Sequence, residues 1–156
     1  MDPQQLRASH AAVIAADPED LYNMVSDITR TGEWSPACTG GQWDKGAAPR
    51  LGAWFTGRNK AGTYEWTTRC QVTAASPGHD FGFVVGGAAD GWVRWTYSFR
   101  PTAGGTLVTE SWEVLRIVPR MGETDDQLLA LRDRTRANLE ATLQTLKDAA
   151  EARTRT

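Results

Sequence analysis

A chain of 156 residues with 40% hydrophobic and 23% charged residues has the composition of a globular protein, which excludes an intrinsically disordered one. Its length fits a single domain over residues 1–156 that buries a core of its own. The formal net charge of −2 and the absence of a Lys/Arg run exclude strong electrostatic attraction to nucleic acid, so we expect no nucleic-acid partner.

The sequence shows no pattern of export or of membrane insertion. Residues 1–5 lack the charged and then apolar order of a signal peptide. No stretch reaches the run of about eighteen apolar residues that a membrane helix needs. Cys38 and Cys70 are the only cysteines, and their spacing matches no metal or redox motif. We therefore expect a cytoplasmic protein with reduced thiols and no stable membrane insertion.

The N-terminal region predicts one strand followed by two short helices. The strand is expected over residues 6–15. Asp17 then has the position of an N-cap, with Pro18 in the first helical turn, where its restricted backbone is favourable. A second short helix is expected over residues 29–34, before the helix-breaking residues 35–36. The apolar residues of the first helix recur at helical spacing: Leu21, Tyr22, Val25 and Ile28.

From residue 40 to residue 118, apolar residues recur at every second position, which predicts strands with one apolar and one polar face. Short turns at Pro77-Gly78, Asp90-Gly91 and Gly104-Gly105 separate these strands. Because short turns join consecutive strands, we expect an antiparallel meander of about six strands after the helices. The apolar faces contain Tyr64, Trp66, Thr68, Cys70 and Val72, then Phe81, Phe83 and Val85, then Val93, Trp95, Tyr97 and Phe99.

Residues 125–152 predict one long amphipathic helix. At about 1.5 Å per residue it is roughly 40 Å long, enough to cross a whole sheet and cover its apolar face. A strongly twisted sheet cannot close tightly around one helix, so we expect a cavity between them. Arg132 is expected close to the apolar stripe and Arg134 away from it. The stripe contains Leu128, Leu131, Thr135, Leu139, Thr142, Leu143 and Leu146.

Six segments resemble, in their order and spacing, the polyketide cyclase/dehydrase group of the START/Bet v1-like (SRPBCC) superfamily. Together they extend over nearly the whole chain. They are Asp17–Tyr22, Ser26–Ile28, Gly32–Pro36, Trp95–Phe99, Gly104–Trp112 and Asn138–Lys147.

The resemblance implies an α+β helix-grip fold. In that fold a curved antiparallel sheet of about seven strands wraps around a long C-terminal helix, with two short helices between strands 1 and 2. It also implies a deep, mainly apolar cavity under that helix. Members include aromatase/cyclases, lipid carriers and hormone receptors, so the fold alone assigns no single activity.

Glu110 is the polar residue most suited to a catalytic role. If its strand turns Val108 and Trp112 inward, Glu110 also faces the cavity, where burial would raise its pKa and suit it to general acid–base catalysis. In the opposite phase Glu110 faces water. A third arrangement is a buried ion pair between Glu110 and Arg132.

Seven tryptophans suit the wall of an apolar site, although core packing explains them equally well. On the helix, Arg132 and Thr135 could fix a polar group of the ligand, or Arg132 could extend to solvent. The expected ligand-binding residues are Tyr64, Trp66, Phe83, Trp95, Tyr97, Trp112, Leu128, Arg132 and Thr135.

The sequence does not predict metal-dependent, nucleophilic or nucleotide-dependent catalysis. His10 and His79 form no cluster with Cys, Asp or Glu, so we expect no metal. No nucleophile elbow is present, and Gly86-Gly87 precedes a turn instead of a helix that could hold phosphate. We expect no cofactor.

Three functions remain open. The first is a binding or carrier protein for a hydrophobic or aromatic small molecule. The second is an aromatase/cyclase or dehydrase that uses Glu110, with Tyr97 as the other candidate proton carrier. The third is a protein-interaction module that uses Trp43 and Trp92. The oligomeric state, monomer or homodimer, is left open.

Overall fold

The structure, a computed structural model, describes residues 1–154. Its helical elements are η1 (Pro3–Gln5), α1 (Pro18–Ser26), η2 (Ile28–Glu33), η3 (Pro119–Met121) and α2 (Asp125–Thr154). Its strands are β1 (Arg7–Ile14), β2 (Cys38–Trp43), β3 (Trp54–Ala61), β4 (Tyr64–Ser76), β5 (Asp80–Val85), β6 (Val93–Thr102) and β7 (Gly105–Val114). The predicted helix-grip fold is confirmed, with one strand and two short helices before a meander of six strands.

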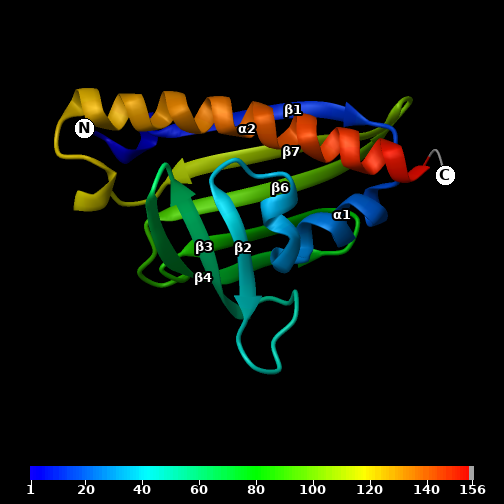
Figure 1. The fold of residues 1–156 in the computed structure, drawn as a ribbon, viewed down its shortest axis with the longest axis horizontal. Helices are drawn as coiled ribbons and strands as arrows, with labels where there is room; N and C mark the ends of the chain where they lie inside the picture. Colours follow the sequence, from blue (N-terminus) through cyan, green and yellow to red (C-terminus); the bar gives the residue numbers. More distant parts are fainter. Residues whose placement is uncertain (155–156) are drawn as a thin grey trace.

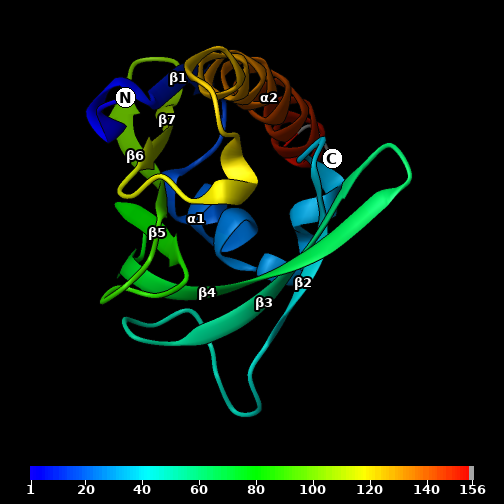
Figure 2. The ribbon, with the colours of Figure 1, turned by 90° about the vertical axis from the view of Figure 1, so that its left-hand side faces the viewer.

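The seven strands form one antiparallel sheet in the order β1-β7-β6-β5-β4-β3-β2. Only the pairing of β1 with β7 joins strands that are far apart in the sequence. β4 is the longest strand and carries a register shift between Val72 and Ala74, the kind of irregularity that bends a strand. The sheet is strongly curved, and α2 lies across the open side of its concave face (Figures 1 and 2).

The two short helices differ in type. Asp17 occupies the predicted N-cap of α1, although its side chain makes no capping hydrogen bond, and Pro18 opens the helix. The second helix, η2, is a 3-10 helix in which the Asp27 side chain accepts a hydrogen bond from the Thr29 amide at 3.2 Å. Gly41 of β2 packs closely on Ile28, so β2 and η2 lie directly against each other.

The core joins α2 to the first and last strands of the sequence. Leu143 and Leu146 are fully buried, as are Ile14 of β1 and Val108 of β7. This contact holds α2 over one side of the sheet and leaves its other flank facing the curved part. No helix within residues 1–154 is long and apolar enough to cross a membrane.

Candidate functional site

The concave face of the sheet and α2 enclose a cavity of about 540 Å³. Trp66, Trp95 and Trp112 line it, as does α2 from Leu131 to Thr142. The cavity that the sequence predicts between the sheet and the last helix is therefore present. Its size falls in the range of small-molecule sites in proteins.

The walls of the cavity are mainly apolar and aromatic. Phe55 and Phe83 meet edge to face with ring centroids 5.0 Å apart. Trp34, which follows η2, is buried and also lines the cavity. Further apolar lining comes from Val25, Ile28, Val85, Val93, Met121 and Leu139. Such a surface favours an apolar ligand body, because binding removes apolar area from water.

Four exposed residues form the mouth of the cavity. Ala61 and Tyr64 belong to the β3–β4 hairpin, Arg120 to η3 and Arg134 to α2. Figure 2 shows these three elements around one end of the curved sheet. Tyr64 stacks on Trp66 with ring centroids 5.3 Å apart, so one side of the mouth is aromatic. The other side is cationic.

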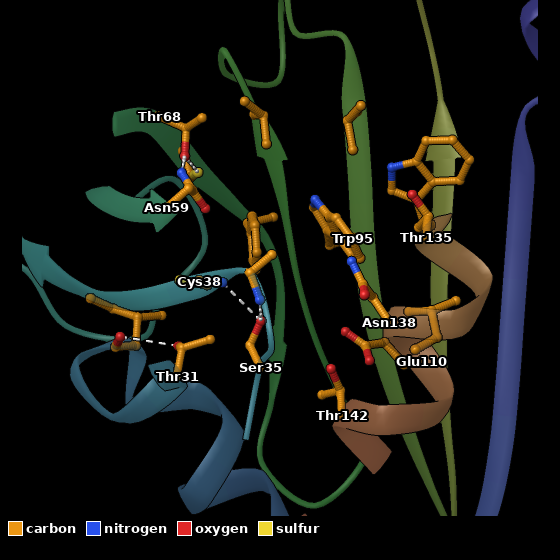
Figure 3. Close-up of a pocket in the computed structure, with 18 of the residues that line it drawn as sticks. Thr31, Ser35, Cys38, Asn59, Thr68, Trp95, Glu110, Thr135, Asn138 and Thr142 are labelled. Carbon is orange, nitrogen blue, oxygen red and sulfur yellow. Dashed lines mark hydrogen bonds between the residues drawn. The ribbon is translucent and has the colours of Figure 1, made fainter. Parts of the chain in front are cut away.

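Polar side chains inside the cavity fall into two groups. Near β2, the Ser35 hydroxyl accepts a hydrogen bond from the Cys38 amide at 3.0 Å, and the Asn59 amide donates to the Thr68 hydroxyl at 3.3 Å. These groups are therefore engaged with one another. The second group faces them from β7 and α2. Figure 3 shows Glu110 pointing toward α2, where Asn138 and Thr142 project from successive turns.

Glu110 is buried in the cavity wall. Val108 and Trp112 are buried on the same face of β7, so the arrangement in which Glu110 faces inward is confirmed. Only 5% of Glu110 is exposed, and its Oε1 atom has no hydrogen-bond partner among the residues that the structure describes. Because an unpaired buried carboxylate is costly, the group can escape this cost by taking up a proton.

The environment of Glu110 shifts its proton equilibrium. Burial raises the pKa from 4.5 to about 8, and the interaction with the Tyr97 side chain offsets only part of this effect. The protonated form of Glu110 therefore predominates at pH 7. Burial and the nearby carboxyl also hold the pKa of Tyr97 well above its usual value of 10. The cavity therefore contains a neutral acid that can both donate and accept a hydrogen bond.

Seven of the nine predicted ligand-binding residues lie in the cavity lining. They are Tyr64, Trp66, Phe83, Trp95, Tyr97, Trp112 and Thr135. The hydroxyl of Thr135, however, donates to the Leu131 carbonyl at 2.8 Å, so its hydrogen is already engaged within the helix.

Leu128 and Arg132 are not among the lining residues, which corrects their predicted position. Leu128 belongs to the apolar stripe of α2, as predicted, but it lies at the start of the helix, where it is buried in the core. Arg132 points off the cavity face and contacts Asp133 at 3.4 Å. The proposed ion pair between Arg132 and Glu110 is therefore absent.

Sequence reasoning missed Arg120, Arg134 and Asn138 in the lining. Arg134 was expected away from the apolar stripe, yet it lines the cavity four residues before Asn138, one helical turn away. Because residues four apart share one face of a helix, this spacing of two polar residues could have predicted that both line the cavity. Arg120 lies in a short 3-10 turn that the periodicity did not reveal.

The two tryptophans considered for protein interaction and the two histidines remain to be placed. Trp43 packs edge to face on Phe55 at 5.3 Å, and Trp92 lies in the cavity wall, so both are half-buried in the fold. Neither histidine lines the cavity, although His10 is the register partner of Glu110 on β1. Within residues 1–154, no three His, Cys, Asp or Glu side chains are grouped so that they could hold a metal ion.

Comparisons with known proteins agree with this architecture. A 36% identical polyketide-cyclase-like protein of Corynebacterium glutamicum, solved by NMR, aligns over 92% of this chain and 91% of its own, with a TM-score of 0.63. A di-domain ARO/CYC protein of the steffimycin biosynthetic pathway shares the fold at 18% identity and a TM-score of 0.77. That alignment covers 97% of this chain and 52% of the larger protein.

A protein of Nitrosomonas europaea has the same fold over the full length of both chains, with 11% identity and a TM-score of 0.73. No curated protein matches the chain in sequence. Residues 5–151 match the family described as polyketide cyclase/dehydrase and lipid transport. The chain belongs to the polyketide cyclase/dehydrase and lipid transport family.

Proposed function

We propose that this protein binds a hydrophobic or aromatic small molecule in the cavity, as a carrier or binding protein of the cytoplasm. The observation that carries the proposal is the cavity of about 540 Å³, whose walls are mainly apolar and whose buried polar groups are few. Few, well-placed polar groups in an apolar site fix the orientation of a ligand, while burial of apolar surface supplies the free energy of binding.

Planar aromatic ligands suit the cavity best. The indole of Trp95 and the ring of Phe83 belong to register partners on neighbouring strands, so both face the same space. Trp112 lies opposite Trp95 on the next strand. Flat aromatic surfaces of this kind favour stacking and edge-to-face contacts with a ring system. The protonated Glu110 can then hydrogen-bond one oxygen of the ligand.

The test is a titration with 1-aminoanthracene, followed by tryptophan emission and probe fluorescence. Binding should be saturable, and Trp95→Ala should weaken it because the substitution removes a wall of the site. Trp54→Ala is the matched control, since Trp54 is half-buried on the adjacent part of the sheet but does not line the cavity. Equal weakening by both variants, or no saturable binding to the wild type, contradicts the proposal.

A second function, aromatase/cyclase or dehydrase activity, is favoured by one observation: Glu110 belongs to the cavity lining, and its buried Oε1 has no hydrogen-bond partner among residues 1–154. A single protonated carboxyl can serve a dehydration. Its proton goes to the leaving hydroxyl, which departs as water, and the carboxylate then takes the proton from the neighbouring carbon. Glu110 returns to its starting state, so no further reactant is needed.

Glu110→Gln separates the two functions. A binding protein keeps its affinity for 1-aminoanthracene in this variant, because the amide preserves the shape of the side chain. An enzyme loses turnover of a model β-hydroxy ketone, measured as water loss by chromatography of the products. Turnover by the wild type that disappears in Glu110→Gln supports the enzyme, and absence of turnover in both supports the carrier.

A further inference from the structure

The charged side chains around the cavity are unevenly distributed. Three ionisable side chains of Arg, Lys, Asp or Glu line it: Arg120, Arg134 and Glu110. Glu110 is buried deep in the wall and is mainly neutral at pH 7, whereas both arginines stand exposed at the mouth. The charged side chains that line the mouth are therefore both positive, although the whole protein carries a net charge of −2.

Arg134 has no acidic partner within its own helix. The residues three and four positions before and after it are uncharged, so no intrahelical ion pair can form. Its neighbours behave differently, because Arg132 and Arg136 both contact the carboxylate of Asp133, at 3.4 and 3.9 Å. The one acid in this turn of α2 thus serves the two arginines that do not line the cavity.

Arg120 is also without an ion pair among residues 1–154. It lies in η3, the short turn between β7 and α2. A second, shallower hollow of about 290 Å³ adjoins the cavity here and shares Trp92 and Arg120 with it. This hollow also contains Arg116, whose guanidinium donates to the Asp90 carbonyl at 2.7 Å. The positive surface therefore continues outside the mouth.

We propose that the ligand is an amphipathic anion, with its apolar body in the cavity and a carboxylate or phosphate group held at the mouth by Arg120 and Arg134. This inference rests on the proposed binding function and adds the charge and the orientation of the ligand. Guanidinium groups suit this task, because their planar forks donate paired hydrogen bonds to carboxylate and phosphate. Two unpaired guanidinium groups facing one opening need no salt bridge to be broken before an anion binds.

The positions of Arg134 and Glu110 along the cavity also fix the orientation of the ligand. Arg134 lies about 6 Å along the helix axis from Asn138 and about 12 Å from Thr142, at 1.5 Å per residue. Asn138 and Thr142 flank the side chain of Glu110 (Figure 3). An anion at the mouth therefore directs the other end of the ligand toward the neutral carboxyl, where an oxygen of the ligand finds a hydrogen-bond donor.

The test compares three compounds with the same apolar chain: dodecanoate, dodecyl phosphate and dodecanol. Each is titrated below its critical micelle concentration, with displacement of 1-aminoanthracene as the readout. We expect the two anions to bind about tenfold more tightly than dodecanol at low salt, within the range of partly exposed charge-assisted contacts. Added salt should reduce this preference, because the arginines are exposed to solvent. The ratio between dodecanoate and dodecyl phosphate shows which anion fits the mouth.

The variants separate the mouth from the rest of the surface. Arg120→Gln and Arg134→Gln should each reduce the preference for the anions, measured as the ratio of anion affinity to dodecanol affinity in the same variant, by about threefold. Arg134→Lys should retain part of the preference. Arg132→Gln is the matched control: it removes the same charge from the same turn of α2, outside the cavity lining, and should keep the full preference.

Two outcomes overturn the inference in different ways. Equal affinity of the wild type for dodecanol and the anions, or equal loss of preference in Arg132→Gln and Arg134→Gln, refutes the anion site while the binding function stands. No displacement by any of the three compounds, together with no binding of 1-aminoanthracene, refutes the binding function and the inference with it. Thermal unfolding of every variant confirms that the fold is retained.

Discussion

Glu110 of β7 and Tyr97 of β6 are direct partners across an antiparallel strand pair, and both side chains line the cavity. Burial is the main cause of the raised pKa of both side chains, and it favours their neutral forms. The pair therefore supplies hydroxyl donors and acceptors in an apolar wall without a permanent charge. Under the proposed function, this pair allows the cavity to hold an apolar ligand at neutral pH and to hydrogen-bond one of its oxygen atoms.

The first prediction concerns stability against pH. Because the folded-state pKa of Glu110 is raised from 4.5 to about 8, the unfolded chain loses its proton first. The contribution of Glu110 to the free energy of unfolding should be fully present below pH 4.5 and fall as the pH rises to about 8, by on the order of a few kcal/mol. Glu110→Gln should remove this slope and be more stable than the wild type at pH 8.

The measurement is urea unfolding of both proteins at intervals between pH 4 and pH 9. The comparison isolates Glu110, because every other titrating group is shared. A wild-type slope that persists unchanged in Glu110→Gln would show that other groups cause it, and a slope of opposite sign would show that the carboxylate is stabilised in the fold.

The second prediction concerns the thiols. Burial raises the pKa of Cys70 to about 12 and also raises the pKa of Cys38 above its usual value of 9. Since the thiolate is the reactive form, Cys70 in the folded protein should react with iodoacetamide at pH 8 about a thousandfold more slowly than an unperturbed cysteine. Mass spectrometry of peptides after timed labelling gives the rates.

Urea-unfolded protein is the control, in which both cysteines should react at similar rates. Because both also line the cavity, bound 1-aminoanthracene should slow the labelling of Cys38 further. Rapid labelling of Cys70 in the folded protein would show that the cavity opens more often than its burial indicates.

The third prediction concerns the packing of α2 on the sheet. Leu143 is fully buried between α2 and the sheet, so Leu143→Ala should lower the free energy of unfolding by about 2–5 kcal/mol. Leu51→Ala is the matched control, because 70% of Leu51 is exposed and its loss should cost less than about 0.5 kcal/mol. Denaturant unfolding measures both, and similar losses in the two variants would contradict this assignment of the core.

Local patterns in the sequence determined most of the fold. Apolar residues at every second position predicted the strands, and the stripe that begins at Leu128 predicted α2, because both patterns arise from backbone geometry within one element. The resemblance added the order in which the elements pack. The short 3-10 turn η3 escaped prediction, since three residues are too few to show a period.

Tertiary structure decided which residues form the site. The alternation in β7 allowed Glu110 to face either way, and only pairing with β1 and β6 placed it inside. In the same way the rotation of α2 about its axis depends on packing against β1. That packing turned Arg134 toward the cavity and Arg132 toward Asp133. Residues two apart on a helix point in nearly opposite directions, about 200° apart, so only one of these two arginines can face the cavity.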